Sequence, residues 1–318
     1  MREVVGIDVA KATLAVVLVR DTGKRVHKQV GNTAAGHQAL LQWLTRHTPA
    51  PAVVGLEATG GYHEAVAEVL DEAGHHVSVL PPLVVAAYGQ SQLRRAKTDP
   101  TDAELIADFM RTQHPPRWRP APREIRHLQA LVRRLDALLE MQVQEQNRLA
   151  VGAQIVQPSI LATLAHLADQ IATVKQQIAD HIDQFPSLRT ARDLIVSIPG
   201  IGEATAAVLL GELLHVRRFT SARQLAAFSG LVPQVRQSGT SVRGRGRLSK
   251  LGSARLRKAL YFPALTAIRH NPPLHRFAAR LRAAGKPKMV VVAAVMRKLL
   301  HQIFGVLTSG RRFDPTAA

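Results

Sequence analysis

The chain has 318 residues, of which 46% are hydrophobic, and its 42 Lys and Arg against 23 Asp and Glu give a formal net charge of +19. This length and apolar content are typical of a folded protein of about two domains and exclude a disordered chain. The absence of cysteine excludes disulfides, thiolate metal sites and a cysteine nucleophile.

Strands that alternate with helices are predicted for the first part of the chain. Residues 3–20 hold two β-branched runs separated by Asp-Val-Ala-Lys, which predicts a hairpin of buried strands, and a third strand follows near 24–30. A helix within 37–47, a strand at 52–57, a helix at 62–73 and a strand at 75–80 complete an α/β sheet. Asp99 or Thr101 is expected to cap a helix that runs through Met110.

A Pro- and Arg-rich stretch, HPPRWRPAP, is expected to link this sheet to a helical region. From Glu124 to Ile182 apolar residues recur at helical intervals and predict a hairpin of two long helices. Leu164, Leu167, Ile171, Val174 and Ile178 form a coiled-coil-like seam of about two heptads. From the sequence this seam is equally consistent with packing inside the chain and with a dimer interface.

The segment SIPGIGEATAAVLL fits a helix-hairpin-helix pattern. In this pattern a glycine turn, here Gly200 and Gly202, lets backbone N–H groups at a helix start approach a phosphate. The alternative is a tight turn between helices in which the glycines serve only the backbone geometry.

Four acidic residues stand out by position. Asp8 lies within a predicted apolar strand, Glu57 ends another, and Asp99 and Asp102 share a face of one helical turn. An acid in a buried strand is costly unless it is paired or binds a metal. All four could therefore converge on one or two Mg²⁺ or Mn²⁺ ions that align a phosphodiester for cleavage. This order, an Asp in one strand, a Glu in the next and a pair of Asp in a helix, is also found in RuvC-like, RNase H-type nucleases. Actin-like ATPases also open with a hairpin that contains an apolar-Gly-Ile-Asp stretch, but they need glycine-rich phosphate loops after it, and DVAKATL lacks them.

Positive charge is concentrated in the last third of the chain. Residues 213–313 contain no Asp or Glu but 21 of the 42 basic residues. Such segregation favours a polyanionic partner over a generally basic surface. Nucleic-acid contacts are expected from the glycine turn and from the basic residues Arg236, Arg243, Arg245, Arg247, Lys250, Arg255, Arg257 and Lys258. Because aromatic residues make up 4% of the chain, contacts to the sugar-phosphate backbone should outweigh base stacking.

Seven motifs in this order, GIDVAK, GLEATGGY, AKTDPTDA, SIPGIG, AAFSGLVP, QSGTS and GRLSKLGSARLRKALY, resemble the DEDD transposases of the insertion-sequence-110 family over about residues 4–314. The resemblance implies a RuvC-like DEDD domain (1–115), a helical coiled-coil linker region (116–190) and a basic, mainly α transposase domain (191–318).

The resemblance also implies a mechanism. Asp8, Glu57, Asp99 and Asp102 would bind the metal, and a serine nucleophile, placed by motif position at Ser238, would form a covalent bond with DNA. Ser241 and Ser249 are alternatives that the chemistry of the sequence leaves open. The family further implies double-stranded target and donor DNA, a structured bridge RNA as guide, and a homodimer or homotetramer whose active sites combine domains of different subunits.

Two other functions are also consistent with this sequence. A structure-specific Holliday-junction nuclease would use only the carboxylates, and a nucleic-acid-binding scaffold would use neither carboxylates nor serine. No uninterrupted apolar run approaches the length that spans a bilayer, and the Val-rich run near Met289–Val295 is expected to be a buried helix. We therefore expect a protein of the bacterial cytoplasm without a membrane partner.

Overall fold

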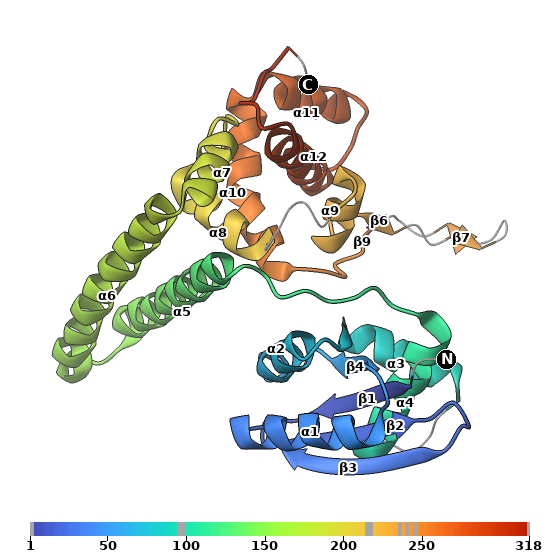
Figure 1. The fold of residues 1–318 in the computed structure, drawn as a ribbon. Helices are drawn as coiled ribbons and strands as arrows, with labels where there is room; N and C mark the ends of the chain where they lie inside the picture. The colour runs from blue at the N-terminus through green and yellow to red at the C-terminus, as the bar shows by residue number, and fades with distance from the viewer. Residues whose placement is uncertain are drawn as a thin grey trace. The chain divides into compact units, whose positions relative to one another are not determined.

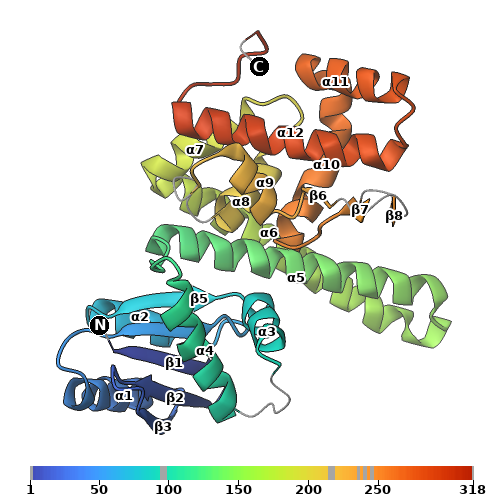
Figure 2. The same cartoon turned by 90° about the vertical axis from the view of Figure 1, so that its right-hand side faces the viewer.

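The computed structural model describes residues 3–93, 99–213, 219–234, 237–238, 242–243 and 247–316. The chain divides into two compact units, residues 1–120 and 121–318. Their helices and strands are labelled in Figures 1 and 2, and each unit is described by itself.

The first unit is built on a five-stranded mixed sheet of order β3-β2-β1-β4-β5. Strands β1 (Val4–Val9), β2 (Thr13–Val19) and β3 (Arg25–Gly31) are antiparallel neighbours. Strands β4 (Val53–Glu57) and β5 (His76–Leu80) continue the sheet parallel to β1. This topology confirms the predicted α/β sheet of RuvC-like, RNase H-type form, and it places β1 and β4 side by side in the centre.

Helices cover both faces of this sheet (Figure 2). On one face, α1 (Ala34–His47) and α2 (Glu64–Glu72) pack on a core that includes Ile7, Leu14 and Leu56. On the other face lies α4 (Asp99–Gln113), whose Ala103, Ile106 and Met110 are buried. Helix α3 (Pro82–Ser91) packs against α4 through the edge-to-face pair Tyr88 and Phe109. Sequence reasoning missed α3 because PLVVAAYGQS is apolar without helical periodicity.

The predicted linker is docked on the sheet. The backbone N–H of Trp118 donates to Val77 O at 2.7 Å, and Ser78 Oγ donates to Pro116 O at 3.0 Å. Arg117 adds an ion pair with Asp71 at 2.7 Å. These contacts with β5 and α2 explain why the first unit runs through Pro120, past the boundary expected at residue 115.

The second unit begins with the predicted helical hairpin, which the structure confirms. Helices α5 (Arg123–Val151) and α6 (Gln157–Gln184) lie side by side in both views, joined through Gly152 and the short 3-10 helix η1 (Gln154–Val156). Along the seam Leu167, Ile171, Val174 and Ile178 are buried in the same core as Leu128 and Leu138 of α5, and Leu164 is half-buried. Of the two alternatives for the seam, the structure shows packing inside the chain.

The rest of the second unit is mainly helical, as predicted. Its helices are α7 (Pro186–Val196), α8 (Glu203–Leu213), α9 (Ala222–Phe228), α10 (Ala254–His270), α11 (Pro272–Ala283) and α12 (Lys288–Ser309). Between α9 and α10 the described chain forms two short antiparallel pairs, β6 (Pro233–Gln234) with β9 (Arg247–Leu248) and β7 (Gln237–Ser238) with β8 (Val242–Arg243).

Helix α12 is the one helix in the described ranges that is long and apolar enough to cross a membrane by length and composition. It packs against α9, α10 and α11, and its Val291, Val295, Leu299 and Ile303 are buried in the core of the second unit. The expected helix at Met289–Val295 is therefore present as the start of a longer core helix, with Val291, Val292 and Val295 buried but Met289 and Val290 exposed.

Candidate functional site

The carboxylates Asp8 and Glu57 lie next to each other at one end of the central strands. β1 and β4 are parallel and pair Ile7 with Leu56, so Asp8 and Glu57 are the next residues on each strand. Neighbouring strands are about 4.8 Å apart, and residues opposite one another project from the same face. Both residues are half-buried. The sheet register thus brings together two of the four predicted site residues.

Two glycines allow α4 to lie directly on these strands. A Cβ at Gly6 of β1 would overlap the carbonyl oxygen of Ala103, and one at Gly55 of β4 would overlap the side chain of Met110. Gly6 and Asp8 share a face of β1, as Gly55 and Glu57 share a face of β4, because alternate residues point the same way. Helix α4 therefore covers the face that carries both carboxylates.

The other two predicted acids begin this helix. Positions 99 and 102 lie one turn before Ala103 and Ile106, the residues that approach Gly6 and Gly55. Pro100 borders a cavity together with Ala15, which pairs directly with Asp8. The first turn of α4 thus lies over the end of the sheet at which Asp8 is found. Asp102 is half-buried, and the side chain of Asp99 lies outside the described parts.

The residue types at this edge fit a hard divalent cation. Carboxylate oxygens are the ligands that Mg²⁺ and Mn²⁺ prefer, and the strand register places Asp8 and Glu57 side by side at the edge of the sheet near which α4 begins. Among the described side chains no group of three or more Asp, Glu or His is arranged to hold a metal. The described carboxylates of Asp8, Glu57 and Asp102 therefore do not form such a group by themselves, and the convergence of all four acids, with the side chain of Asp99 outside the described parts, stays a prediction.

Asn32 is a residue of this edge that sequence reasoning missed. Its amide nitrogen donates to Ala10 O at 3.0 Å and to Tyr62 O at 3.1 Å, so it joins the loops that follow β1 and β4. His37 Nε2 donates to Asn32 Oδ1 at 2.8 Å and holds the amide in that orientation. Asn32 therefore fixes the two loops next to Asp8 and Glu57. The signal was an Asn between a strand and the helix cap Thr33, which is usually only a turn residue.

The predicted serine lies in a β-hairpin arm between α9 and α10. Ser238 is on β7, opposite Val242 of β8, and its side chain lies outside the described parts. Ser241 is outside the described residues altogether. Ser249 Oγ accepts a hydrogen bond from Leu251 N at 3.1 Å, and Ser249 N donates to Val232 O at 2.9 Å, so this serine stabilises the base of the arm.

Arg257 of α10 closes the base of this arm. Its Nη1 donates to the carbonyl oxygens of Ser229, Gly252 and Ser253 at 3.1, 3.1 and 3.3 Å. Gly252 has a φ of +133°, and a Cβ there would overlap the carbonyl oxygen of Phe228. One guanidinium therefore connects the residues that enter the arm with those that leave it. A contact of Arg257 with nucleic acid would compete with these hydrogen bonds, and it stays a prediction.

Two further basic residues predicted to bind nucleic acid have acidic neighbours inside the second unit. Lys258 Nζ donates to Asp136 at 2.7 Å and to Glu140 at 3.1 Å, both on α5, and these hydrogen bonds raise the pKa of Lys258. Arg255 lies 3.9 Å from Glu212 of α8. The lack of acids in the nearby sequence thus does not extend to the fold, because α5 and α8 bring acids to the start of α10.

The glycine turn between α7 and α8 has one glycine that packing requires and one that is exposed. Gly200 has a φ of +107°, and a Cβ there would lie 2.9 Å from Ala267 N of α10, so this glycine is required for packing. Gly202 is exposed at the start of α8 with open space around it. Glu203 follows in the first turn and would oppose a phosphate there. A phosphate contact at this turn stays a prediction.

The remaining predicted contacts differ in how far the structure describes them. Arg247 and Lys250 are exposed at and just after β9. Arg243 is placed by its backbone on β8, and Arg236 and Arg245 lie outside the described residues.

Comparison with known proteins gives matches to family models over two parts of the chain. Residues 5–154 match the model described as Transposase, of DEDD type and the IS110 group. Residues 192–279 match the model described as Transposase IS116/IS110/IS902 family. The first match includes all four acids, and the second includes the glycine turn and the β-hairpin arm.

Individual relatives cover nearly the whole chain. A pilin gene-inverting protein of Moraxella bovis is 32% identical over 98% of this chain and 97% of its own length. The transposase for insertion sequence element IS1328 of Yersinia enterocolitica is 27% identical over 70% of this chain and 72% of its own length. Among solved structures, Thermus thermophilus RuvC in complex with a Holliday junction substrate matches at 18% identity and a TM-score of 0.28, over 36% of this chain and 96% of that chain.

Proposed function

We propose, since this chain belongs to the IS110 family of DEDD transposases, that it excises and inserts an insertion-sequence element through a covalent serine–DNA intermediate. The chain is an enzyme that acts on DNA, as a transposase or DNA invertase. The observation that carries the proposal is the register that places Asp8 beside Glu57, with the first turn of α4 at the same edge.

The edge of the sheet that carries Asp8 and Glu57, here called the carboxylate edge, is proposed to position the scissile phosphate. Asp8, Glu57, Asp99 and Asp102 would hold Mg²⁺ or Mn²⁺, which supplies charge neutralisation for the phosphodiester. Asn32 would keep the loops after β1 and β4 in place around the DNA strand. The half-burial of Asp8, Glu57 and Asp102 excludes part of the surrounding water, which strengthens electrostatic interactions at this edge.

The bond rearrangement is proposed to run through Ser238. Its Oγ attacks phosphorus, so that an Oγ–P bond forms while one P–O bond of the DNA strand breaks. The serine proton passes to a carboxylate, and the leaving nucleotide oxygen takes up a proton. A hydroxyl of another strand then attacks the phosphoserine, loses its proton and returns the serine hydroxyl. The energy of the phosphodiester is conserved, which direct hydrolysis would not achieve.

We propose a structured bridge RNA as guide and a homodimer or homotetramer as the working form, both in the bacterial cytoplasm. The segregated positive charge of residues 213–313 supports a polyanionic partner. The two units each carry one half of the proposed chemistry, so the halves could come from different subunits. Mixing Asp8→Ala and Ser238→Ala proteins, each inactive alone, should then restore activity, whereas no complementation would indicate sites built from one chain.

The central experiment traps protein–DNA adducts on a denaturing gel. Wild type should give an adduct in Mg²⁺ that EDTA abolishes, and Ser238→Ala and Asp8→Ala should give none. An adduct with Ser238→Ala would move the nucleophile to Ser241 or Ser249. Metal-dependent cleavage that survives Ser238→Ala would indicate a Holliday-junction nuclease, and binding without cleavage or metal response would indicate a scaffold.

DNA inversion is a second candidate, favoured by the full-length similarity to the Moraxella bovis protein. Inversion and transposition share the strand chemistry and differ in whether the rejoined ends lie on one DNA molecule. A plasmid with two recombination sites in opposite orientation, together with a separate target plasmid, distinguishes them. Inverted products without insertion into the target would favour the invertase.

A further inference from the structure

A row of side chains crosses the sheet from its edge strand to the carboxylates. Gln29 of β3 pairs with Ala15 of β2, and Ala15 pairs with Asp8 of β1. Residues opposite one another in a sheet project from the same face. Gln29, Ala15 and Asp8 therefore share the face covered by α4, and so does His27, two residues before Gln29 on the same strand.

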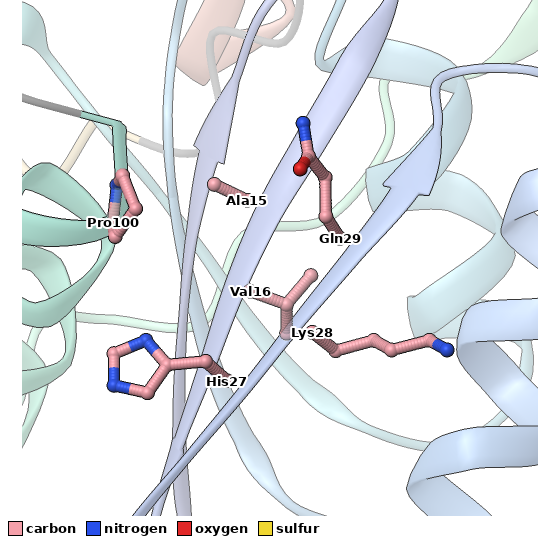
Figure 3. A pocket seen from close by; sticks show the side chains of 6 residues that line it. All are labelled: Ala15, Val16, His27, Lys28, Gln29 and Pro100. Atoms are coloured by element: carbon pink, nitrogen blue, oxygen red, sulfur yellow. The ribbon is translucent and has the colours of Figure 1, made fainter.

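A cavity lies over this row beside Asp8. Its volume is about 310 Å³, and it is lined by Ala15, Val16, His27, Lys28, Gln29 and Pro100 (Figure 3). Ala15 leaves the space open because its side chain ends at Cβ. Pro100, from the first turn of α4, borders the opposite side, and Lys28 points away from His27, as alternation along a strand requires.

Side-chain contacts connect β3 with α4 beside the cavity. His27 Nε2 lies 3.3 Å from Glu104 Oε1 of α4. Arg25, two residues earlier on β3, bonds to Glu104 and also to Asp108, at 3.2 Å. These contacts hold the edge strand against the helix that carries Asp99 and Asp102. Both walls of the cavity therefore belong to the first unit and are joined by side-chain contacts.

The chemistry of the lining suits a nucleotide strand. The side-chain amide of Gln29 is exposed and makes no hydrogen bond within the described part of the chain. A neutral amide can donate to a phosphate oxygen close to carboxylates, whereas a Lys or Arg at this position would pair with Asp8 or Glu104 instead. The volume lies at the lower end of the range for small-molecule sites, about 300 to 1,000 Å³, which leaves room for a single nucleotide unit.

We propose that this cavity binds the sugar-phosphate of the nucleotide next to the scissile phosphate in the DNA strand, with the Gln29 amide donating to a phosphate oxygen. The inference rests on the proposed function, because it takes the Asp8 edge as the place of cleavage. Gln29 is then a positioning residue that holds the strand while the carboxylates act on the neighbouring phosphate.

The test is a coupling experiment on binding. Dissociation constants are measured for wild type and Gln29→Ala on DNA oligonucleotides that carry one methylphosphonate at each phosphate around the cleavage site in turn. We expect Gln29→Ala to weaken binding of unmodified DNA about ten-fold, as loss of a hydrogen bond to a charged group does. At one phosphate adjacent to the scissile one, the methylphosphonate and the mutation should be non-additive.

Matched variants keep the outcome interpretable. Ala15→Leu, which fills the cavity, should weaken binding and lose the same coupling, while Gln42→Ala, an exposed Gln on α1 over the opposite face, should bind as wild type does. Additive effects at every DNA phosphate would overturn the proposal, including its choice of DNA as the strand that is bound. Because binding is measured, the result is independent of cleavage, whose absence in wild type with Mg²⁺ would overturn the proposed function instead.

Discussion

Gly6 and Gly55 occupy equivalent places under α4 but meet different atoms. The missing Cβ of Gly6 makes room for the helix backbone at Ala103 and Ala107, which cannot move without moving the whole helix. The missing Cβ of Gly55 makes room mainly for the side chain of Met110, which is flexible. The tolerance of each position to alanine should differ accordingly.

We predict that Gly6→Ala lowers the free energy of unfolding by about 3 kcal/mol, and Gly55→Ala by about 1 kcal/mol, because overpacking against backbone is relieved less easily than overpacking against Met. Gly6→Ala should also abolish cleavage, since it displaces the helix start that carries Asp99 and Asp102. Urea unfolding and adduct assays measure both effects. Equal destabilisation by the two substitutions would contradict the packing argument.

His75 makes the stability of the first unit sensitive to acid. Its Nδ1 accepts a hydrogen bond from Ala52 N at 3.1 Å, which requires a neutral ring nitrogen, and burial holds the pKa of His75 below its ordinary value of 6.5. The unfolded chain takes up a proton near pH 6.5 while the folded chain resists it. Stability is therefore fully present above about pH 6.5 and is lost as the pH falls through that value toward the lower pKa of the folded state.

We predict that His75→Gln, which keeps an acceptor but does not titrate, reduces the loss of melting temperature between about pH 7.5 and about pH 5.5. Part of the loss should remain, because burial also lowers the pKa of His37 and, against the opposing effect of Glu64, that of His63. Thermal unfolding followed by circular dichroism gives the comparison. An unchanged loss in the variant would show that His75 does not carry the effect.

At the scale of elements, the β-hairpin arm depends on α10. The arm has few main-chain pairs of its own in the described residues, β6 with β9 and β7 with β8. Its base is held by Arg257 and by Arg297 of α12, whose Nη1 donates to Leu231 O at 3.3 Å. The position of Ser238 should therefore respond to substitutions in helices that do not contain it.

We predict that Arg257→Gln lowers adduct formation at least ten-fold and changes DNA affinity by less than about three-fold. The carbonyl oxygens at the base of the arm lose their hydrogen-bond donor, so the arm that carries Ser238 is held less firmly. Arg247→Gln, on the exposed side of the arm, should do the reverse and weaken binding with a smaller effect on the chemistry. Adduct yield at saturating DNA and the dissociation constant separate the two. A large loss of affinity in Arg257→Gln would instead support the nucleic-acid contact suggested by the sequence.

Most elements could be predicted because their patterns are local. Runs of β-branched residues predicted β1 and β2, and three- and four-residue spacing predicted α6. Helix α3 could not be found, since its sequence lacks a polar face. The carboxylate edge was predictable from acids inside apolar strands, whereas Asn32 was not, because its partners Ala10 and Tyr62 come together only through the order of strands.

At the scale of the whole molecule, the sequence gives the number of basic residues but not which of them are free to contact a phosphate. The sequence shows the acid-free stretch, but the contacts of Lys258 with Asp136 and Glu140 come from a helix more than 100 positions earlier. A phosphate that approaches Lys258 also approaches those two carboxylates. Lys250 is exposed, and the ion pairs within the described residues do not include it. The two lysines should therefore contribute unequally to nucleic-acid binding.

We predict that the affinity of the protein for DNA falls by roughly 10³ or more between 50 and 200 mM salt, which corresponds to about six or more phosphate contacts. Lys250→Gln should reduce the slope of log K against log salt by about 0.9, the value for one phosphate on duplex DNA, and Lys258→Gln should reduce it by less than half of that. Titrations of labelled duplex at several salt concentrations measure both slopes. A flat response in wild type would show that phosphate contacts do not dominate binding, and equal changes in the two variants would show that the α5 carboxylates release Lys258 to the DNA.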